Sequence, residues 1–214
     1  MKVGVFIPTT KRPELIRSCV SQWLLQTRQP DLICVHQNGQ GASYEWAIDD
    51  LRSVKPIDWL YTPKSIPRIQ WYLPAIEHLY EQGCTHFFWG DHDDMYQRHH
   101  IQTRLEELEQ RDFTIAQAAG VVILAQDKYQ YSPRLNFLTH PPRGQSASMA
   151  FTRRFAKALI DDLHNEKDSN LFADQVLANT TVKRFDYQFS KKQSTVNVSH
   201  KDSVTSHTWL KHIE

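Results

Sequence analysis

Residues 87–96 read FFWGDHDDMY. An aromatic run and a glycine are followed by four residues that carry three carboxylates, those of Asp91, Asp93 and Asp94. At an effective dielectric constant of about 20, two such charges roughly 4 Å apart repel by about 4 kcal/mol. A divalent cation would offset this repulsion, and a solvated turn would also relieve it. The stretch therefore predicts a buried strand that ends in a cation site or in an exposed acidic turn.

The first half of the chain alternates between short apolar runs and helical patterns. The apolar runs predict strands at residues 3–7, 32–35, 58–61 and 85–89. Apolar spacing predicts helices at residues 13–27, 43–53 and 67–82, and a polar helix is expected at 98–111. This order is typical of an α/β protein whose mostly parallel central sheet is flanked by helices.

In such a sheet, ligands bind beyond the carboxyl ends of the strands. Three loops are expected at that edge: residues 8–12, 36–41 and 90–94. The acidic stretch thus falls where a ligand is expected, and its position favours the cation site over the plain turn.

The second half of the chain is less regular. Strands are expected at residues 113–117, 121–124, 129–131 and 146–151, and helices at 153–163 and 171–179. Residues 132–144 read as a loop, and residues 190–214 read as a polar tail without secondary structure. No linker separates two units, so a single domain is predicted.

The composition narrows the class of protein. Basic and acidic residues nearly balance, with a formal charge of +1, so no strong basic field would recruit nucleic acid. Three scattered cysteines indicate reduced thiols in a cytoplasmic protein. The apolar run near the N-terminus is too short for a signal peptide, and no stretch is apolar enough to span a membrane.

The loop after the first strand reads Pro-Thr-Thr-Lys-Arg-Pro over residues 8–13. It lacks both the glycine pattern of dinucleotide-binding enzymes and the P-loop of nucleoside triphosphatases. Its hydroxyls and Arg12 could hold a nucleotide or a phosphate, or they could simply begin a helix. In the acidic stretch, Asp91 and Asp93 form a D-x-D pattern, and such oxygen ligands suit Mn²⁺ or Mg²⁺.

Several stretches, in this order, resemble inverting family 2 glycosyltransferases of the GT-A fold. VGVFIPTTKRPELIRSCVSQWLLQTRQPDLICVHQNG at residues 3–39 resembles their opening strand, turn, helix and second strand. FFWGDHDD resembles their fourth strand with its D-x-D-D motif, and ADQVL at residues 173–177 resembles a later motif that begins a helix. Small stand-alone domains of this kind are also encoded by large viruses of algae.

The resemblance implies roles for the acidic residues. Asp93 matches the carboxylate that binds Mn²⁺ or Mg²⁺, and Asp91 matches the one that faces the ribose or the metal. Asp94 is the next candidate in that loop. Asp174 matches the general base that deprotonates the acceptor hydroxyl. His200, in the tail, matches a ligand of the metal or the diphosphate in some relatives.

The resemblance also implies residues on the nucleotide side. Thr9 and Arg12 match the nucleotide-binding loop, and Arg68 matches a basic residue that precedes the fourth strand. The family's second strand usually ends in an acidic pair that reads uracil. Here it ends in His36, Gln37 and Asn38, so Asn38 takes that place and a strict preference for uridine is in doubt.

Other interpretations of these residues stay open. The Asp174 carboxylate would also complement the positive end of a helix dipole. His86, His92, His99 and His100 resemble a zinc cluster, but no cysteine accompanies them. In the tail, Trp209 is a candidate for stacking on an acceptor sugar.

Together these features predict one GT-A domain, with a nucleotide-binding half at 1–95, an acceptor-side half at 96–189 and a tail or lid at 190–214. Its predicted activity is transfer of a glucose- or rhamnose-like hexose from a nucleoside-diphosphate sugar, above all a UDP-sugar, to a glycan hydroxyl. The alternative is a catalytically silent module that binds a nucleotide sugar or a glycan. A phosphohydrolase or nucleotidyltransferase is disfavoured by the loop after the first strand. The expected location is the cytoplasm, or the host cytoplasm if the protein is viral.

Overall fold

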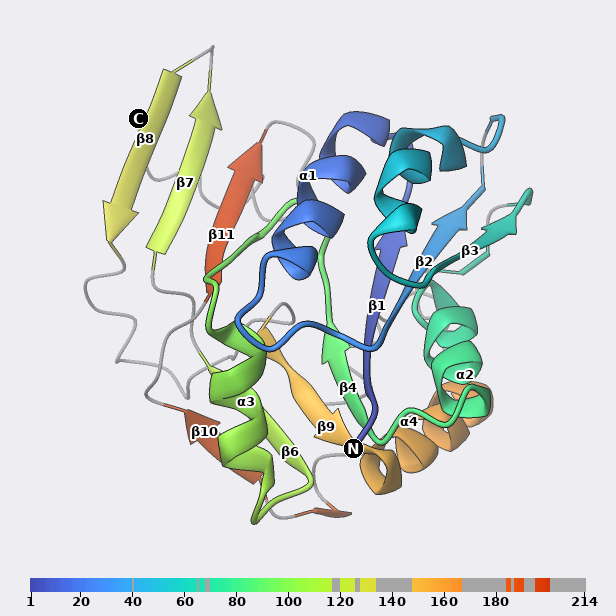
Figure 1. Ribbon diagram of the computed structural model, residues 1–214, viewed down its shortest axis with the longest axis vertical. Helices are drawn as coiled ribbons and strands as arrows, with labels where there is room; N and C mark the ends of the chain where they lie inside the picture. The colour runs from blue at the N-terminus through green and yellow to red at the C-terminus, as the bar shows by residue number, and fades with distance from the viewer. Residues whose placement is uncertain are drawn as a thin grey trace.

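The structure of the protein is a computed structural model that describes residues 1–39, 41–64, 66–67, 70–116, 120–125, 128–133, 148–166, 184–185, 187–190 and 195–200. Its central sheet has seven strands in the order β10-β6-β9-β4-β1-β2-β3 (Figure 1). Their bounds are β1 Val3–Thr9, β2 Leu32–Asn38, β3 Ile57–Thr62, β4 His86–Trp89, β6 Phe113–Ala116, β9 Ala150–Thr152 and β10 Tyr187–Ser190. The predicted mostly parallel sheet is confirmed, and β9 alone among these strands runs antiparallel to its neighbours β4 and β6.

Strand β1 lies at the point where the order of the strands reverses. The chain runs outward from β1 to β2 and β3, and then crosses back so that β4 pairs with the other side of β1. Both pairings are parallel: Thr9 lies beside Gln37 of β2, and Phe6 lies beside Trp89 of β4. The loops after β1 and β4 therefore leave the same edge of the sheet as neighbours, and this is the position at which open α/β sheets bind ligands.

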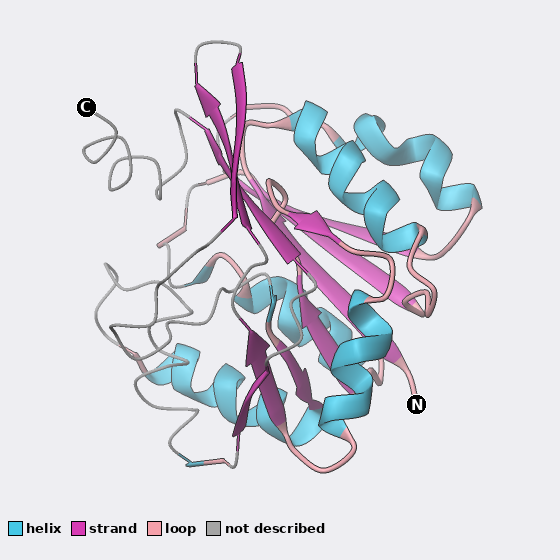
Figure 2. Cartoon of the chain, turned by 90° about the vertical axis from the view of Figure 1, so that its left-hand side faces the viewer, coloured by secondary structure: helices cyan, strands magenta, loops and turns pink. Residues whose placement is uncertain are grey.

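Helices cover both faces of the sheet (Figure 2). On one face lie α1 (Pro13–Leu24), the 3-10 helix η1 (Glu45–Ser53) and α3 (His100–Leu108); on the other lie α2 (Leu73–Glu81) and α4 (Arg153–Asn165). Strand β1 shows why both cores form. Val3, Val5 and Ile7 face the core of α1, whereas Phe6 faces the core of α2 and α4. An apolar run without alternation is typical of a parallel strand that is buried on both sides.

Two predicted helices differ from the observed ones. The helix predicted at 43–53 is a 3-10 helix, so its tighter turn replaces the expected α-helical one. The helix predicted at 67–82 begins only at Leu73, because Pro74 occupies its first turn and the preceding backbone approaches β2 instead.

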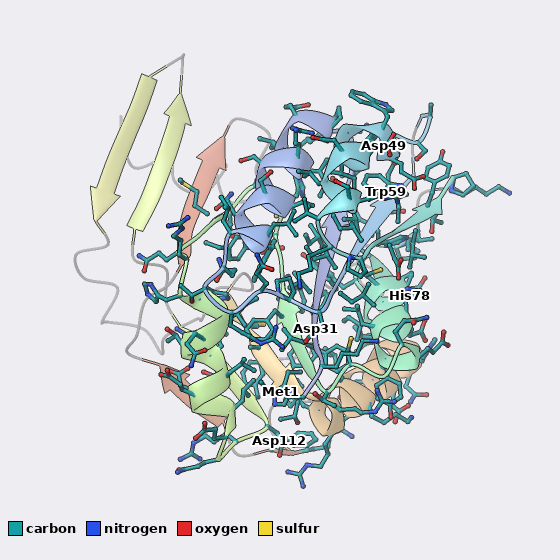
Figure 3. All side chains as sticks on the ribbon, in the orientation of Figure 1. Met1, Asp31, Asp49, Trp59, His78 and Asp112 are labelled. Carbon is teal, nitrogen blue, oxygen red and sulfur yellow. The ribbon has the colours of Figure 1, made fainter. Side chains whose placement is uncertain are left out.

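The start of β2 is tied to β1, because the Asp31 carboxylate accepts a hydrogen bond of 2.8 Å from the main-chain N–H of Val3 (Figure 3).

A second sheet of four strands, in the order β5-β11-β7-β8, corrects the prediction for the tail. It consists of β5 (Met95–Tyr96), β7 (Gly120–Ala125), β8 (Lys128–Pro133) and β11 (Thr195–His200). Residues 190–214 were expected to lack secondary structure, but this segment contains β11, which runs parallel to β7 and antiparallel to β5. The sequence signal is the alternation of Val196 and Val198 with polar residues, which is the period of a strand. Strands β5 and β10 were also missed.

The remaining strands and helices of the second half are close to the predictions. Strand β9 is shorter than the run predicted at 146–151, and α4 extends the helix predicted at 153–163 by two residues. The predicted helix 171–179 and most of the predicted loop 132–144 lie outside the described residues. Among the helices that the structure describes, none combines the length and the apolar composition that crossing a membrane requires.

Candidate functional site

The loops after β1 and β4 are joined by Arg12. Its guanidinium Nη1 lies 3.0 Å from Oδ2 of Asp93 and 3.2 Å from Nε2 of His92. The other ring nitrogen of His92, Nδ1, lies 3.1 Å from the carbonyl oxygen of Pro8. Because a carbonyl only accepts and a guanidinium only donates, Nδ1 of His92 carries the proton and Nε2 accepts. Residues 80 or more positions apart in sequence thus meet at the reversal point of the sheet.

The Asp91 carboxylate contacts aromatic side chains. Its Oδ1 accepts hydrogen bonds of 3.1 Å from the Tyr72 hydroxyl and from Nε1 of Trp89. The rings of Tyr72 and Trp89 pack with their centroids 4.1 Å apart, and Phe6 packs against both. The side chain of Asp91 is therefore fixed against an aromatic cluster, and Arg12 pairs with Asp93.

Gly90 allows β4 to turn directly into the acidic loop. Its N–H donates to the carbonyl of Phe6 at 2.9 Å. A Cβ at this position would lie 2.9 Å from a side-chain carbon of Ile7, 3.2 Å from Nε1 of Trp23 and 3.3 Å from the Phe6 carbonyl oxygen. Real Cβ atoms are essentially never found at the first of these distances, so a side chain at position 90 would push the acidic loop away from β1.

The nucleotide-side residues predicted in the first loop lie beside this arrangement. Thr9 is buried, and its hydroxyl lies 2.9 Å from the Tyr44 hydroxyl, where either oxygen could donate. Lys11 has a φ of +53°, in the left-handed region that residues other than glycine seldom adopt. Such outliers cluster at ligand sites, where the surrounding structure holds them in place. Here the outlier directly precedes Arg12.

The end of β2 uses its polar side chains to hold neighbouring loops. Oδ1 of Asn38 accepts a hydrogen bond of 3.1 Å from the N–H of Ile66. The amide of Gln37 bonds to the backbone of the loop that follows, at Ala42 and Tyr44. Asn38, which the resemblance places on the nucleotide side, and Gln37 thus both fix the loops on either side of the ligand edge.

His36 braces the segment that leads into α2. Its Nδ1 donates to the carbonyl of Trp71 at 2.7 Å, and its Nε2 lies 2.8 Å from the Thr62 hydroxyl and accepts from it. Burial lowers the pKa of His36 below its usual value, and the bond to Trp71 opposes this only in part. A neutral histidine that the sequence did not single out thus helps to position Tyr72 beside Asp91.

In the acidic loop, the carboxylates of Asp91 and Asp93 are partly exposed and could reach a cation. Asp93 keeps about a fifth of its side chain exposed (20%), whereas Asp94 is buried, with 4% of its surface accessible. Among the residues whose side chains are described, no group of three His, Cys, Asp or Glu could hold a metal ion. Mg²⁺ commonly takes only one or two protein carboxylates and completes its shell with substrate phosphates and water. The carboxylate of Asp93 fits that use.

The other predicted site residues are placed only in part. His200 is the last residue of β11, whose first residues pair with β5 directly after the acidic loop. Arg68, Asp174 and Trp209 lie outside the described residues. The described structure therefore brings together Thr9, Arg12, Asp91 and Asp93.

No family model matches the chain, and no curated protein matches it in sequence. Solved structures share its fold at low identity. The S. aureus TarS fragment 1–349 in complex with UDP has a TM-score of 0.65 and 12% identity over 93% of this chain. The same fragment in complex with UDP-GlcNAc has a TM-score of 0.63 and 12% identity over 96% of this chain.

A 4-diphosphocytidyl-2C-methyl-D-erythritol synthase from Anaerococcus prevotii DSM 20548 has a TM-score of 0.51 and 12% identity, over 93% of this chain and 86% of its own. The present chain spans 61% of the TarS fragment and 37% of the longer TarS chain. At these identities the likeness establishes the fold alone, and it confirms the predicted GT-A architecture.

Proposed function

We propose that this protein is a metal-dependent, inverting glycosyltransferase that moves a hexose from a nucleoside-diphosphate sugar to a glycan hydroxyl. One observation carries the proposal. In a fold shared with a UDP-binding TarS structure, the loops after β1 and β4 bring a cationic side chain and a partly exposed carboxylate together at the reversal point of the sheet. A diphosphate with its cation needs groups of both kinds.

Arg12 is the group that would hold the diphosphate. A guanidinium offers several N–H donors in one plane and stays charged at all physiological pH values, so it matches phosphate oxygens in charge and geometry. As the bond to the sugar breaks, negative charge grows on the diphosphate, and a fixed cation stabilises that charge. His92 would keep the guanidinium oriented, because it accepts from Nη1 while its own N–H is anchored on Pro8.

Asp93 would hold the divalent cation, Mn²⁺ or Mg²⁺. When bound, such a cation supplies a further positive charge next to the departing diphosphate. Asp91, anchored on Tyr72 and Trp89, would set the position of the loop and face the ribose. His200 is proposed as an additional ligand from β11.

The remaining roles rest on the sequence. Asp174 is proposed to take the proton of the acceptor hydroxyl as general base. Arg68 is proposed to contact the diphosphate, and Asn38 and Thr9 are proposed to line the nucleotide side. We place the activity in the cytoplasm, because the three cysteines, Cys19, Cys34 and Cys84, are free thiols in buried positions.

A panel of nucleoside-diphosphate sugars with Mn²⁺ tests this proposal by thermal shift. A ligand present at about 100 times its dissociation constant stabilises a protein by roughly 2.7 kcal/mol. Asp93→Asn should lose the Mn²⁺-dependent part of this stabilisation and keep the fold. Asp50→Asn is the matched control, because Asp50 also pairs with an arginine, Arg17, but lies exposed on η1.

The silent binding module is the second candidate. The observation that favours it is that both Asp91 and Asp93 already bond to protein groups, so a donor could be held without being activated. Release of UDP in the presence of glycan acceptors distinguishes the two. Donor binding without any transfer or hydrolysis would favour the module. Failure of every nucleotide and nucleotide sugar to bind would refute the enzyme and the nucleotide-sugar module, and would leave only a module that binds a glycan.

A further inference from the structure

The hydroxyl of Tyr96 bonds to both main-chain polar groups of one residue, Asp91. The Asp91 N–H donates to the Tyr96 hydroxyl oxygen at 2.6 Å, and the hydroxyl in turn donates to the Asp91 carbonyl at 3.1 Å. The two residues are five positions apart, so the hydroxyl links the beginning of the acidic loop to the strand that follows it. The thiol of Cys19 in α1 also points to that carbonyl, at 3.6 Å.

The Asp91 carbonyl is also the first acceptor of the acidic turn. It accepts a hydrogen bond of 3.2 Å from the N–H of Asp94, the bond that defines a four-residue turn. His92 and Asp93 are the two central residues of this turn, and both contact Arg12. A group that holds the Asp91 carbonyl in place therefore also fixes the direction in which the turn presents Asp93.

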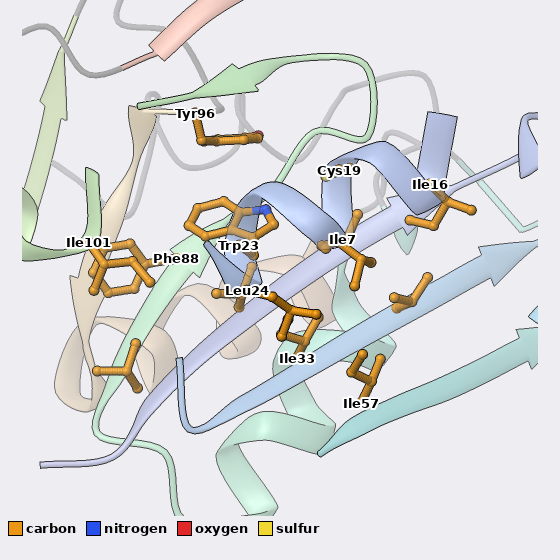
Figure 4. Packing of buried hydrophobic residues seen from close by; sticks show 14 of the residues in the cluster. Ile7, Ile16, Cys19, Trp23, Leu24, Ile33, Ile57, Phe88, Tyr96 and Ile101 are labelled. Carbon is orange, nitrogen blue, oxygen red and sulfur yellow. The ribbon is translucent and has the colours of Figure 1, made fainter. Parts of the chain in front are cut away.

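The ring of Tyr96 is itself held firmly (Figure 4). It packs on Trp23 with ring centroids 4.3 Å apart and contacts the His100 ring at 5.5 Å. Its main-chain N–H donates to Oε1 of Gln22 at 2.8 Å. Tyr96 thus connects α1 to the acidic turn, because it contacts Gln22 and Trp23 of the helix and the main chain of Asp91.

We propose that Tyr96 is a positioning residue of the donor site: its hydroxyl holds the main chain of Asp91 and so sets where the acidic turn presents Asp93. This role rests on the proposed function, because it is the donor diphosphate and its cation that would benefit from the fixed turn. Loops that bind ligands lose affinity when they must be ordered on binding. The hydroxyl of Tyr96 would remove that cost in advance.

Tyr96→Phe is the direct test, because it deletes one oxygen and keeps the ring. The affinity for UDP in the presence of Mn²⁺ is measured by calorimetry, well below the unfolding temperature. We expect it to fall about tenfold, and the KM for the donor to rise more than kcat falls. Hydrogen exchange gives a readout without ligand: the Asp91 amide should lose protection in the variant, since its acceptor is gone.

Thr114→Val is the matched control, because it also deletes a buried hydroxyl that is hydrogen-bonded, in this case to Glu107 at 2.6 Å. It should lower the unfolding temperature and leave UDP affinity unchanged. If Tyr96→Phe does not fold, Gln22→Leu removes the acceptor of the Tyr96 N–H from a half-buried site on α1, and it should weaken UDP binding in the same direction.

Three results would overturn the role of Tyr96. The first is UDP affinity within twofold of the wild type in Tyr96→Phe, or in Gln22→Leu where that variant has to replace it. The second is an equal loss of affinity in Thr114→Val, because the effect would then reflect general destabilisation. In the third, the wild type binds neither UDP nor any nucleotide sugar; this also refutes the proposed function, whereas the first two leave it standing.

Discussion

Replacing Arg12 by glutamine should change the affinities for metal and for nucleotide in opposite directions. In the structure, the Arg12 guanidinium pairs with the Asp93 carboxylate that the proposed cation needs, at 3.0 Å. A cation must displace Arg12 from Asp93 before it binds there, so Arg12 competes with it. A nucleoside diphosphate, by contrast, gains a charged partner in Arg12. Arg12→Gln removes both effects and keeps a polar side chain of similar reach.

The magnitude follows from the burial of the pair. Two unit charges about 4 Å apart attract by about 4 kcal/mol at an effective dielectric constant of 20, but removal of both from water offsets most of this. Fully exposed pairs retain about 0.2–1 kcal/mol. The side chains of Arg12 and Asp93 are 19% and 20% exposed, so a net value of about 1–2 kcal/mol is reasonable for this pair. The variant should then bind Mn²⁺ alone about 5- to 30-fold more tightly, since about 1.4 kcal/mol is tenfold.

The affinity for UDP should fall in the same variant. A hydrogen bond to a charged group contributes about 1.5–3 kcal/mol, which corresponds to a loss of roughly tenfold or more. Binding of Mn²⁺ is followed by electron paramagnetic resonance, and binding of UDP by calorimetry. Arg17→Gln is the control: Arg17 lies on α1, the helix that follows Arg12, and pairs with Asp50 at an exposed site, so neither affinity should change. Equal Mn²⁺ affinity in the wild type and Arg12→Gln, with UDP absent, would refute the competition.

Three further predictions concern the loop, the histidines and the base. Gly90→Ala should destabilise the protein by about 1–3 kcal/mol, because the new Cβ would overlap Ile7. Denaturant unfolding measures this loss of stability, and a loss below about 0.5 kcal/mol would contradict the prediction. Burial lowers the pKa values of His36 and His100. The unfolded chain therefore binds more protons than the folded chain as the pH falls, and the free energy of unfolding should decline below about pH 6.5. Equal unfolding free energies at pH 7 and pH 5 would argue against this. Asp174→Asn should reduce sugar transfer about 10²–10⁴-fold with donor affinity unchanged; transfer at the wild-type rate would move the base elsewhere, with Asp168 and Asp202 the next candidates.

The first four strands are predictable from the sequence because each one carries its own signal. Strand β1 begins as a short apolar run and extends through Pro8 and Thr9, and β4 is an aromatic run followed by Gly90 and the acidic turn. Their order along the chain, separated by helical patterns, implies a parallel sheet and hence a common ligand edge. The prediction of a site at residues 8–12 and 90–94 needed no knowledge of three-dimensional contacts.

Strand β11 was missed because its signal is short and its partners are distant. Val196 and Val198 alternate with polar residues over six positions, and the surrounding polar composition outweighed that pattern. The strand pairs with β7, more than 70 residues earlier, and with the two-residue strand β5. Such pairings are set by tertiary contacts, because two-residue strands carry no periodicity of their own.

The end of β2 shows a different limit of sequence reasoning. Asn38 and Gln37 are polar residues at the ligand edge, and the family resemblance assigns Asn38 to the nucleotide side. In the structure, Oδ1 of Asn38 bonds to Ile66 and the amide of Gln37 closes the loop up to Tyr44. A buried main-chain N–H must find a partner, and which side chain provides it depends on how distant loops approach. The sequence supplies the donors and acceptors but not their pairing.

The same limit applies to Arg12 and Asp93, and here it bears on function. Sequence reasoning assigned Arg12 to the nucleotide and Asp93 to the metal at one edge of the sheet, but it predicted no contact between the two side chains. The structure joins them in one ion pair across 81 positions of sequence. A ligand that draws Arg12 away from Asp93 would also make that carboxylate available to a cation, and linkage requires the reverse effect to be equal. Metal and nucleotide should therefore each strengthen the binding of the other, and Arg12→Gln should reduce that mutual dependence to the part that direct contact between the cation and the diphosphate supplies.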